Sequence, residues 1–165
     1  MDHLWTPWRM TYLQGNSPNP DGCLFCNAAA SPETDEALFV LHRGQHAFII
    51  LNLYPYNNGH LMIVPFEHTP SIEQLSPETL TEIMTLSQRA LATLRHAYEP
   101  QGFNLGINVG AAAGAGVPGH VHLHIVPRWA GDTSFMSAIG NTRVVPEWLP
   151  QTYQRLRELW PDSGT

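Results

Sequence analysis

Three histidines occupy every second position in the segment GHVHLHIVPRW, residues 119–129. Side chains alternate between the two faces of a strand, so His120, His122 and His124 would share one face while the aliphatic residues between them face a core. A strand face that only meets solvent does not need imidazoles, because serine, threonine, lysine or glutamate would serve equally well. Neighbouring histidines also repel each other when both are protonated. The spacing therefore indicates a chemical role rather than only an amphipathic strand.

Two kinds of chemistry fit this pattern. A His-x-His strand pair can give two imidazoles to zinc, and a neutral imidazole, with an ordinary pKa of about 6.5, can attack phosphorus as a nucleophile. The preceding segment, residues 108–119, is NVGAAAGAGVPG, in which glycine and alanine let backbone N–H groups approach a ligand. A bare zinc site has no need of such a loop, whereas phosphoryl oxygens that gain charge during a reaction do. The combination favours a nucleophile that acts on phosphate.

All eight basic residues are arginines, and the sequence contains no lysine. This excludes a Schiff-base lysine, a pyridoxal-phosphate anchor and the lysine of a P-loop. Phosphate must be handled by backbone N–H groups, histidine and arginine, for which Arg128 and Arg143 are candidates. The net charge of −6 gives no reason to expect a nucleic-acid polymer as partner, and no apolar run approaches the length of a membrane span.

The second candidate site is the pair Cys23 and Cys26 in the sequence CLFC. The N-terminus shows no export signal, so this spacing indicates metal or redox chemistry rather than a structural disulfide, and a cytoplasmic location is expected. A closed tetrahedral metal site would need two further ligands. A redox pair is the alternative, although no thioredoxin-like βαβ pattern surrounds the cysteines.

The length fits a single domain over residues 1–165, without repeats or an obvious linker. We expect an N-terminal arm over 1–22, a core over 23–130 and a C-terminal extension over 131–165. The arm carries two tryptophans beside an arginine, so we expect it to lie against the body of the protein or against a partner.

The hydrophobic pattern predicts an α+β domain with about five strands, a central helix and a C-terminal helix. The central helix, residues 77–98, follows Ser76, a good N-cap, and has Pro77 at its first position. The C-terminal helix covers 146–160, with Pro150 in its first turn. The predicted strands are residues 37–42, 46–51, 59–68, 102–110 and 120–127.

The segment HVHLHIV matches the pattern His-φ-His-φ-His-φ-φ, where φ is apolar, and resembles the signature of the histidine-triad (HIT) superfamily. The similarity extends to NNGHLMIVPFEH before the central helix and to PRWAGDTSFM after the histidines. Within the superfamily, HLWTPWRMTYL, CLFC and GNTRVVPE most resemble the diadenosine tetraphosphate phosphorylase-like branch. The resemblance covers most of the chain and implies an antiparallel sheet, an adenine nucleotide or dinucleoside polyphosphate as substrate, and a homodimer that joins its sheets.

This resemblance implies a role for each histidine. His122 would be the nucleophile that takes the nucleotidyl group, and its other ring nitrogen should donate to a backbone carbonyl, which fixes the tautomer. His124 would hydrogen-bond phosphate oxygens, and His120 would orient the site. The other implied contacts are Asn108 with the sugar or α-phosphate, and the backbone of Gly114, Ala115 and Gly116 with the phosphates.

The resemblance also implies a metal site. In some HIT proteins, and in the related galactose-1-phosphate uridylyltransferases, a Cys-x-x-Cys pair joins a histidine before the central helix and the first histidine of the triad. The matching residues are Cys23, Cys26, His68 and His120, which would bind a structural zinc with no open position for water. Such a zinc would hold the strand of His122 in place. The alternative is two buried thiols and a His68 that caps or contacts phosphate.

We therefore expect an enzyme that cleaves dinucleoside polyphosphates at the α-phosphate through a nucleotidyl-His122 intermediate, with phosphate as the preferred acceptor. One departure leaves the acceptor open, because many HIT hydrolases carry Gln or Ser just before the triad, whereas residues 115–118 are Ala-Gly-Val-Pro. The alternatives are a hydrolase that uses water, an adenine-nucleotide-binding protein without turnover, and a zinc hydrolase in which the three histidines bind the metal.

Overall fold

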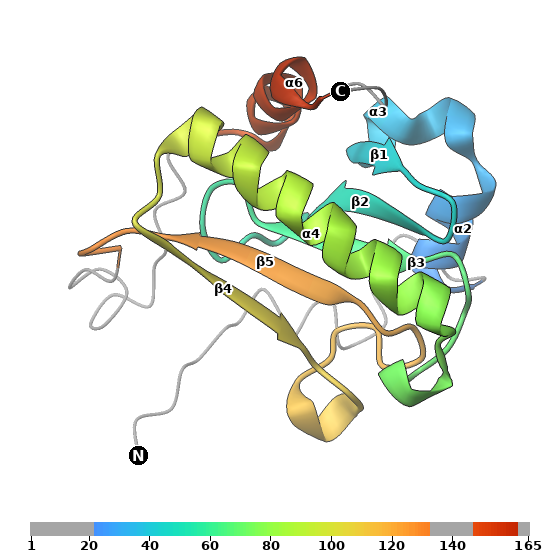
Figure 1. Cartoon of the computed structure of the whole chain (residues 1–165). Helices are drawn as coiled ribbons and strands as arrows, with labels where there is room; N and C mark the ends of the chain where they lie inside the picture. Colours follow the sequence, from blue (N-terminus) through green and yellow to red (C-terminus); the bar gives the residue numbers. More distant parts are fainter. Residues whose placement is uncertain (1–21, 133–146, 162–165) are drawn as a thin grey trace.

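The computed structural model describes residues 22–132 and 147–161. They form a five-stranded antiparallel sheet in the order β1-β2-β3-β5-β4, with helices on both faces (Figure 1). This confirms the predicted α+β class. The strands are β1 (Val40–Arg43), β2 (Ala47–Leu51), β3 (Leu61–Pro65), β4 (Gly102–Ile107) and β5 (Leu123–Arg128). The helices are α2 (Leu24–Ala30), α3 (Asp35–Leu38), α4 (Pro77–Tyr98) and α6 (Leu149–Leu159), with short 3₁₀ turns η1 (Pro32–Thr34), η2 (Ile72–Gln74) and η3 (Ala111–Ala113).

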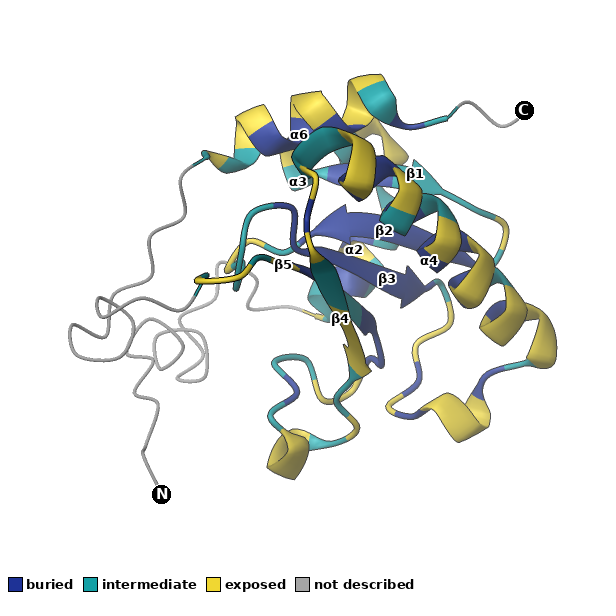
Figure 2. Cartoon of the chain, turned by 60° about the vertical axis from the view of Figure 1, so that its left-hand side comes forward, coloured by how far each residue is buried: buried dark blue, intermediate teal, exposed yellow. Residues whose placement is uncertain are grey.

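The sheet separates two apolar layers. Alternate residues of β2, β3 and β5 pack against α4 and α6, and Figure 1 shows α4 crossing this face of the sheet diagonally. On the opposite face, α2 contributes Phe25 and Ala28 to a smaller core that includes Phe48 and Val64. Figure 2 shows that the central strands are buried, whereas β4 at the edge is largely exposed.

The alternation of side chains decides on which face the histidines lie. Leu123 and Ile125 of β5 belong to the core under α4. His122 and His124, at the alternate positions, therefore lie on the face that carries α2. The main core and the candidate site thus use opposite faces of the same strand.

Helix α4 has the bounds that the sequence predicts because both of its ends carry clear signals. The Ser76 hydroxyl accepts a hydrogen bond from the N–H of Thr79, 3.1 Å away, and Pro77 begins the helix. At the other end Glu99 adopts a left-handed conformation, with φ of 47°, and ends the helical hydrogen bonding. Within the described residues, neither this helix nor any other combines the length and apolarity needed to cross a membrane.

The strand of the three histidines begins later than predicted, at Leu123 rather than at residue 120. Pro65 at the end of β3 has no N–H to donate, and the pairing between β3 and β5 starts at Leu123. The N–H of Val121 donates instead to the carbonyl of Thr69, 2.7 Å away. His120 therefore precedes the strand, and its environment differs from that of the other two histidines.

Other predicted bounds also need correction, and one helix was missed. Strand β1 starts at Val40 rather than at 37, because acidic residues that favour a helix N-terminus open the short helix α3 there. Strand β4 ends at Ile107 rather than at 110, where the chain turns into η3. Helix α2 was not predicted, since seven residues give too short a pattern. The N-terminal arm up to residue 21, and Arg143, lie outside the described residues.

Candidate functional site

His122 is held as a neutral imidazole with a defined tautomer. Its Nδ1 lies 2.9 Å from the carbonyl oxygen of His120. A carbonyl can only accept, so Nδ1 carries the hydrogen and Nε2 keeps its lone pair. Burial lowers the pKa of His122, and the hydrogen bond to the carbonyl opposes this shift only in part. The ring thus presents a nucleophilic nitrogen near neutral pH, in the tautomer that the sequence analysis expects.

His124 has the opposite tautomer, which a fourth histidine determines. The backbone N–H of Tyr56 donates to Nδ1 of His60 over 3.1 Å, so Nε2 of a neutral His60 carries the hydrogen. This Nε2 lies 3.0 Å from Nδ1 of His124 and donates to it. The hydrogen of His124 is therefore on Nε2, where it can be donated to an oxygen of a ligand.

Sequence reasoning missed His60 as a functional residue. It is 1% exposed and lies directly before β3, 64 residues from His124. The alternation in His60-Leu61-Met62 is visible in the sequence, and it places His60 on the face of Met62. What the sequence does not give is the register, which pairs Met62 with His124.

His120 faces the two cysteines rather than the other histidines. Its Nε2 donates to the carbonyl of Pro65 over 2.8 Å, so Nδ1 keeps its lone pair. This Nδ1 lies 3.3 Å from Sγ of Cys23 and 3.6 Å from Sγ of Cys26. Sγ of Cys26 is also 3.1 Å from Nδ1 of His68. The four residues that the resemblance implies as ligands are thus brought together.

The geometry of these four residues fits a tetrahedral zinc site. Their ligand atoms all lie within 4.8 Å of one another. Zn–S and Zn–N bonds of ordinary length place tetrahedral ligands about 3.6 Å apart, close to the separations seen here. Burial and the adjacent Cys23 thiol raise the pKa of Cys26, so two thiolates need a cation to coexist here. The bond from His120 to a backbone carbonyl is the outer contact that zinc-binding histidines use.

An arginine from β1 fixes the helix that carries the cysteines. Cys23 is the N-cap of α2, whose last turn contains no basic residue of its own. Arg43 donates to the carbonyls of Ala28 and Ala29 at the C-terminal end of the helix, over 2.6 and 3.0 Å. The guanidinium also forms an ion pair with Asp35 at 2.6 Å. A cation at this end stabilises the helix and fixes the cysteines relative to the sheet.

The glycine and alanine loop lies between β4 and the histidines. Gly110 and Gly114 adopt positive φ values of 81° and 86°, which only glycine tolerates easily, and η3 lies between them. The N–H groups of Gly114 and Ala115 donate back to the loop, to the carbonyls of Ala111 and Gly110. Of the three predicted backbone donors, these two therefore already have internal acceptors, and Gly116 is the strongest candidate to donate to a phosphate.

An open space adjoins His124 on the side of β4. Gly106 is paired with His124 across the two strands, and a Cβ atom added at this position would meet no atom of the described residues within 4 Å. Asn108 directly follows β4, two residues beyond Gly106. A ligand above the histidines would therefore find room over Gly106.

The structure does not bring Arg128 to the histidines. It ends β5, four residues after His124, which corresponds to about 13 Å along a strand. Its guanidinium donates to Asp132 over 2.8 Å and to Asn104 over 2.7 Å. This pairing fixes the turn after β5, and the phosphate site proposed below does not include Arg128.

Comparison with known proteins agrees with this geometry. The HIT domain family model matches residues 33–131. An AP-4-A phosphorylase of Mycobacterium tuberculosis is 38% identical over 97% of this chain and 85% of its own length. A bis(5'-nucleosyl)-tetraphosphatase [asymmetrical] of Schizosaccharomyces pombe is 33% identical over 58% of this chain and 52% of its own length.

A solved structure has the same fold. The crystal structure of a Zn-bound histidine triad family protein from Mycobacterium smegmatis superposes with a TM-score of 0.68 at 29% identity, over 84% of this chain and 93% of that one. The segment matched by the HIT domain family model contains all three histidines of the triad, together with His60 and His68. On the strength of the family model, the relatives and the arrangement of the histidines, the chain belongs to the histidine-triad (HIT) family of nucleotide-processing enzymes.

Proposed function

We propose that this chain is a phosphorylase of dinucleoside polyphosphates, such as diadenosine tetraphosphate, that works through a nucleotidyl group on His122. The observation that carries the proposal is the pair of tautomers, with a lone pair on Nε2 of His122 and a hydrogen on Nε2 of His124. One ring can attack phosphorus while its neighbour, with ring centroids 4.7 Å apart, donates to an oxygen of the same phosphoryl group. The similarity to the AP-4-A phosphorylase supports the choice of substrate.

The proposed reaction has two displacements at one phosphorus atom. In the first, Nε2 of His122 forms an N–P bond to the α-phosphorus, and the P–O bond to the polyphosphate breaks, which releases ATP from diadenosine tetraphosphate. In the second, an oxygen of inorganic phosphate attacks the same phosphorus, the N–P bond breaks and ADP leaves. His124, the N–H of Gly116 and the amide of Asn108 are the proposed contacts of the phosphoryl group and sugar.

A hydrolase that uses water is the second candidate. It is favoured by the similarity to the asymmetrical tetraphosphatase. The choice of phosphate as acceptor rests on the similarity to the phosphorylase, which extends over more of the chain.

The test is the product of diadenosine tetraphosphate cleavage with and without inorganic phosphate. We expect ADP and ATP in equal amounts, formed only when phosphate is present. AMP and ATP without phosphate would show that water is the acceptor. No product under either condition, together with tight AMP binding, would favour a nucleotide-binding protein without turnover.

We propose that Cys23, Cys26, His68 and His120 bind a structural zinc. The four donor atoms, their spacing and the Zn-bound structure of the M. smegmatis protein support this assignment. When bound, zinc would supply the positive charge that holds two thiolates beside two imidazoles. Neither cysteine forms a disulfide, which suits the reducing cytoplasmic location that the sequence predicts.

We propose a homodimer that joins the two sheets at β4. This strand lies at one end of the sheet order, and Leu105 on it is 41% exposed. The opposite edge is covered, because Tyr153 and Arg157 of α6 donate to the carbonyls of Val40 and Leu41 in β1. Among the residues that the structure describes, no helix covers the β4 edge in this way, and an apolar strand edge of this kind favours pairing with a second chain.

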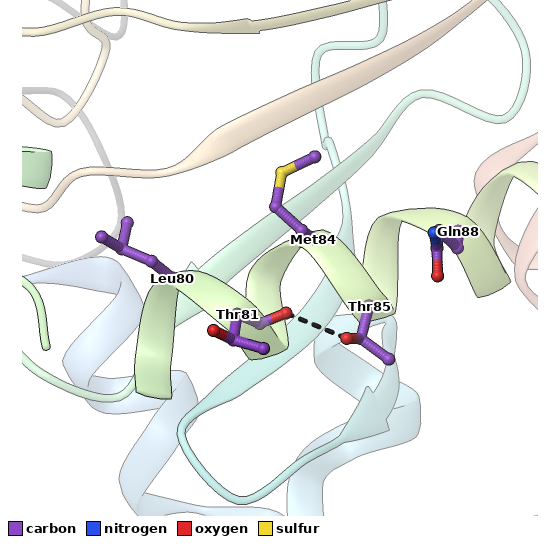
Figure 3. Close-up of a pocket in the computed structure, with 5 residues that line it drawn as sticks. All are labelled: Leu80, Thr81, Met84, Thr85 and Gln88. Atoms are coloured by element: carbon purple, nitrogen blue, oxygen red, sulfur yellow. Dashed lines mark hydrogen bonds between the residues drawn. The ribbon is translucent and has the colours of Figure 1, made fainter. Parts of the chain in front are cut away.

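The outer face of α4 provides further apolar surface for this dimer. A shallow hollow there is lined by Leu80, Thr81, Met84, Thr85 and Gln88 (Figure 3). Leu80 and Met84 are 38% and 58% exposed, and the helix covers the same face of the sheet on which Leu105 lies.

Leu105→Asp should convert the dimer into a monomer in sedimentation velocity. A wild-type protein that sediments as a monomer would refute the proposal.

A further inference from the structure

Phe25 lies between the two cysteines and contacts the nucleophile. Its side chain is 1% exposed, and its ring centroid is 4.9 Å from that of His122, at an angle of 59°. It also meets the ring of His120 edge-on, at 5.4 Å and 78°. The hydrogen bond from Nδ1 of His122 fixes one atom of that ring. Contacts with the rings of Phe25 and His124 are what restrict its plane.

The helix that carries Phe25 is held at both ends. At its N-terminus the two cysteine sulfurs contact the rings of His68 and His120. At its C-terminus Arg43 binds the last carbonyls and Asp35. The backbone of Phe25 is therefore fixed relative to the sheet, and burial of its side chain restricts the ring to its place beside His122.

We propose that Phe25 is a positioning residue for His122, whose ring keeps Nε2 directed at the α-phosphorus. This inference rests on the proposed nucleotidyl transfer. Attack in line with the breaking bond requires precise placement, and a displacement of about 1 Å costs about 10²-fold in rate. Phe25 acts through the imidazole and is assigned no contact with the nucleotide, so its loss should slow the transfer without weakening nucleotide binding.

The matched control is Phe48, a second buried aromatic residue of the same core. Phe48 is fully buried in β2 and stacks on Phe66 at 5.4 Å. Within the part of the chain that the structure describes, its ring contacts no histidine. Phe25→Leu and Phe48→Leu remove the same atoms from one core. The Phe48 ring also lies 5.7 Å from the Arg43 guanidinium, so the control variant tests any effect that reaches α2 through Arg43. Only Phe25→Leu removes a ring from the nucleophile.

The experiment measures the single-turnover rate of nucleotidyl-histidine formation from diadenosine tetraphosphate, the dissociation constant of AMP and the melting temperature. We expect both variants to melt at lower temperature and to bind AMP as the wild type does. Phe25→Leu should form the adduct about tenfold or more slowly, whereas Phe48→Leu should keep the wild-type rate. Equal rates in the two variants, whether both slow or both unchanged, would overturn the assignment.

A second variant distinguishes the effect of the flat, rigid ring of Phe25 from the effect of the volume that its side chain fills. Methionine fills irregular apolar space without a rigid ring, so Phe25→Met should fold well and still form the adduct slowly. Recovery of the wild-type rate would show that bulk alone suffices, and the positioning role would be wrong. A wild-type protein that forms no adduct would instead overturn the proposed function itself, and this assignment with it.

Discussion

The hydrogen on Nε2 of His124 depends on a ring that lies 64 residues earlier in the chain. His60→Phe keeps an aromatic ring but removes the donor to Nδ1 of His124, so the hydrogen of His124 is no longer confined to Nε2. We expect kcat for diadenosine tetraphosphate to fall by about tenfold to a hundredfold. Steady-state kinetics tests this, with the exposed His96→Phe on α4 as the control. An unchanged kcat in the His60 variant would show that the tautomer of His124 does not matter.

For single residues of the site, the sequence predicts the chemical role better than it predicts the hydrogen-bond partner. The resemblance to the HIT superfamily makes His122 the nucleophile, and the requirement for a neutral nucleophile predicts that it donates to a backbone carbonyl, which the structure provides through His120. The partner of His124 could not be predicted, since it depends on which strand pairs with β5. Arg128 was a reasonable phosphate ligand by charge alone, but Asp132 binds its guanidinium.

One carboxylate joins α4 to the turn of the first hairpin, in addition to the apolar core between them. Glu82 on α4 accepts hydrogen bonds from three consecutive N–H groups in the turn between β1 and β2, those of Gln45, His46 and Ala47. Burial raises the pKa of Glu82, but these three donors outweigh it and hold the pKa below its ordinary value of 4.5. A carboxyl group whose folded pKa is lowered stabilises the protein above its unfolded pKa, and this contribution is lost as the pH falls through the folded pKa.

Glu82→Gln should therefore lower the free energy of unfolding at pH 7 by about 2 kcal/mol. The difference from the wild type should shrink as the pH falls below about 4.5, where the wild-type carboxyl group becomes protonated. Denaturant unfolding at several pH values measures it, with the exposed Glu158→Gln on α6 as the control. A difference that does not change with pH would show that the charge on Glu82 is not what stabilises the turn.

Elements with strong local signals are predictable, and those that depend on tertiary contacts are not. Helix α4 has the predicted bounds because Ser76, Pro77 and the apolar spacing all act locally. The late start of β5 depends on Pro65, which lies on a different strand. The short helix α2 is stabilised by Arg43, 14 residues beyond Ala29, so its own seven residues carry too little signal.

The proposed zinc joins three distant parts of the molecule, namely α2, the segment after β3 and the start of the triad strand. Removal of the metal with a chelator should lower the melting temperature by at least about 10 °C, because structural zinc contributes several kcal/mol to folding. Cys23→Ser should show the same loss and respond no further to the chelator. Metal analysis and thermal unfolding measure both effects.

A catalytic zinc on the three histidines predicts the opposite result. Chelation would then abolish activity, whereas Cys23→Ser would leave the activity intact. The structure argues against this arrangement, because Nδ1 of His120 faces the cysteines while Nδ1 of His122 is bound to a carbonyl. The three histidines thus have three separate environments.

For the whole molecule, composition and hydrophobic pattern were sufficient for the α+β class and about five strands. Composition and hydrophobic pattern could not predict the strand order β1-β2-β3-β5-β4, because pairing between β3 and β5 joins residues about 60 positions apart. That order brings His60 beside His124 and α2 beside His120. The site is therefore a product of topology as much as of the triad motif.

The central claim is that His122 carries the nucleotidyl group, and trapping the adduct tests it most directly. The protein is mixed with diadenosine tetraphosphate without phosphate, unfolded in denaturant at alkaline pH, where phosphoramidates survive, and digested for mass spectrometry. We predict one AMP group on the ring of His122, lost on addition of phosphate and absent from His122→Ala. Turnover by His122→Ala at the wild-type rate, or an adduct on another residue, would contradict the account.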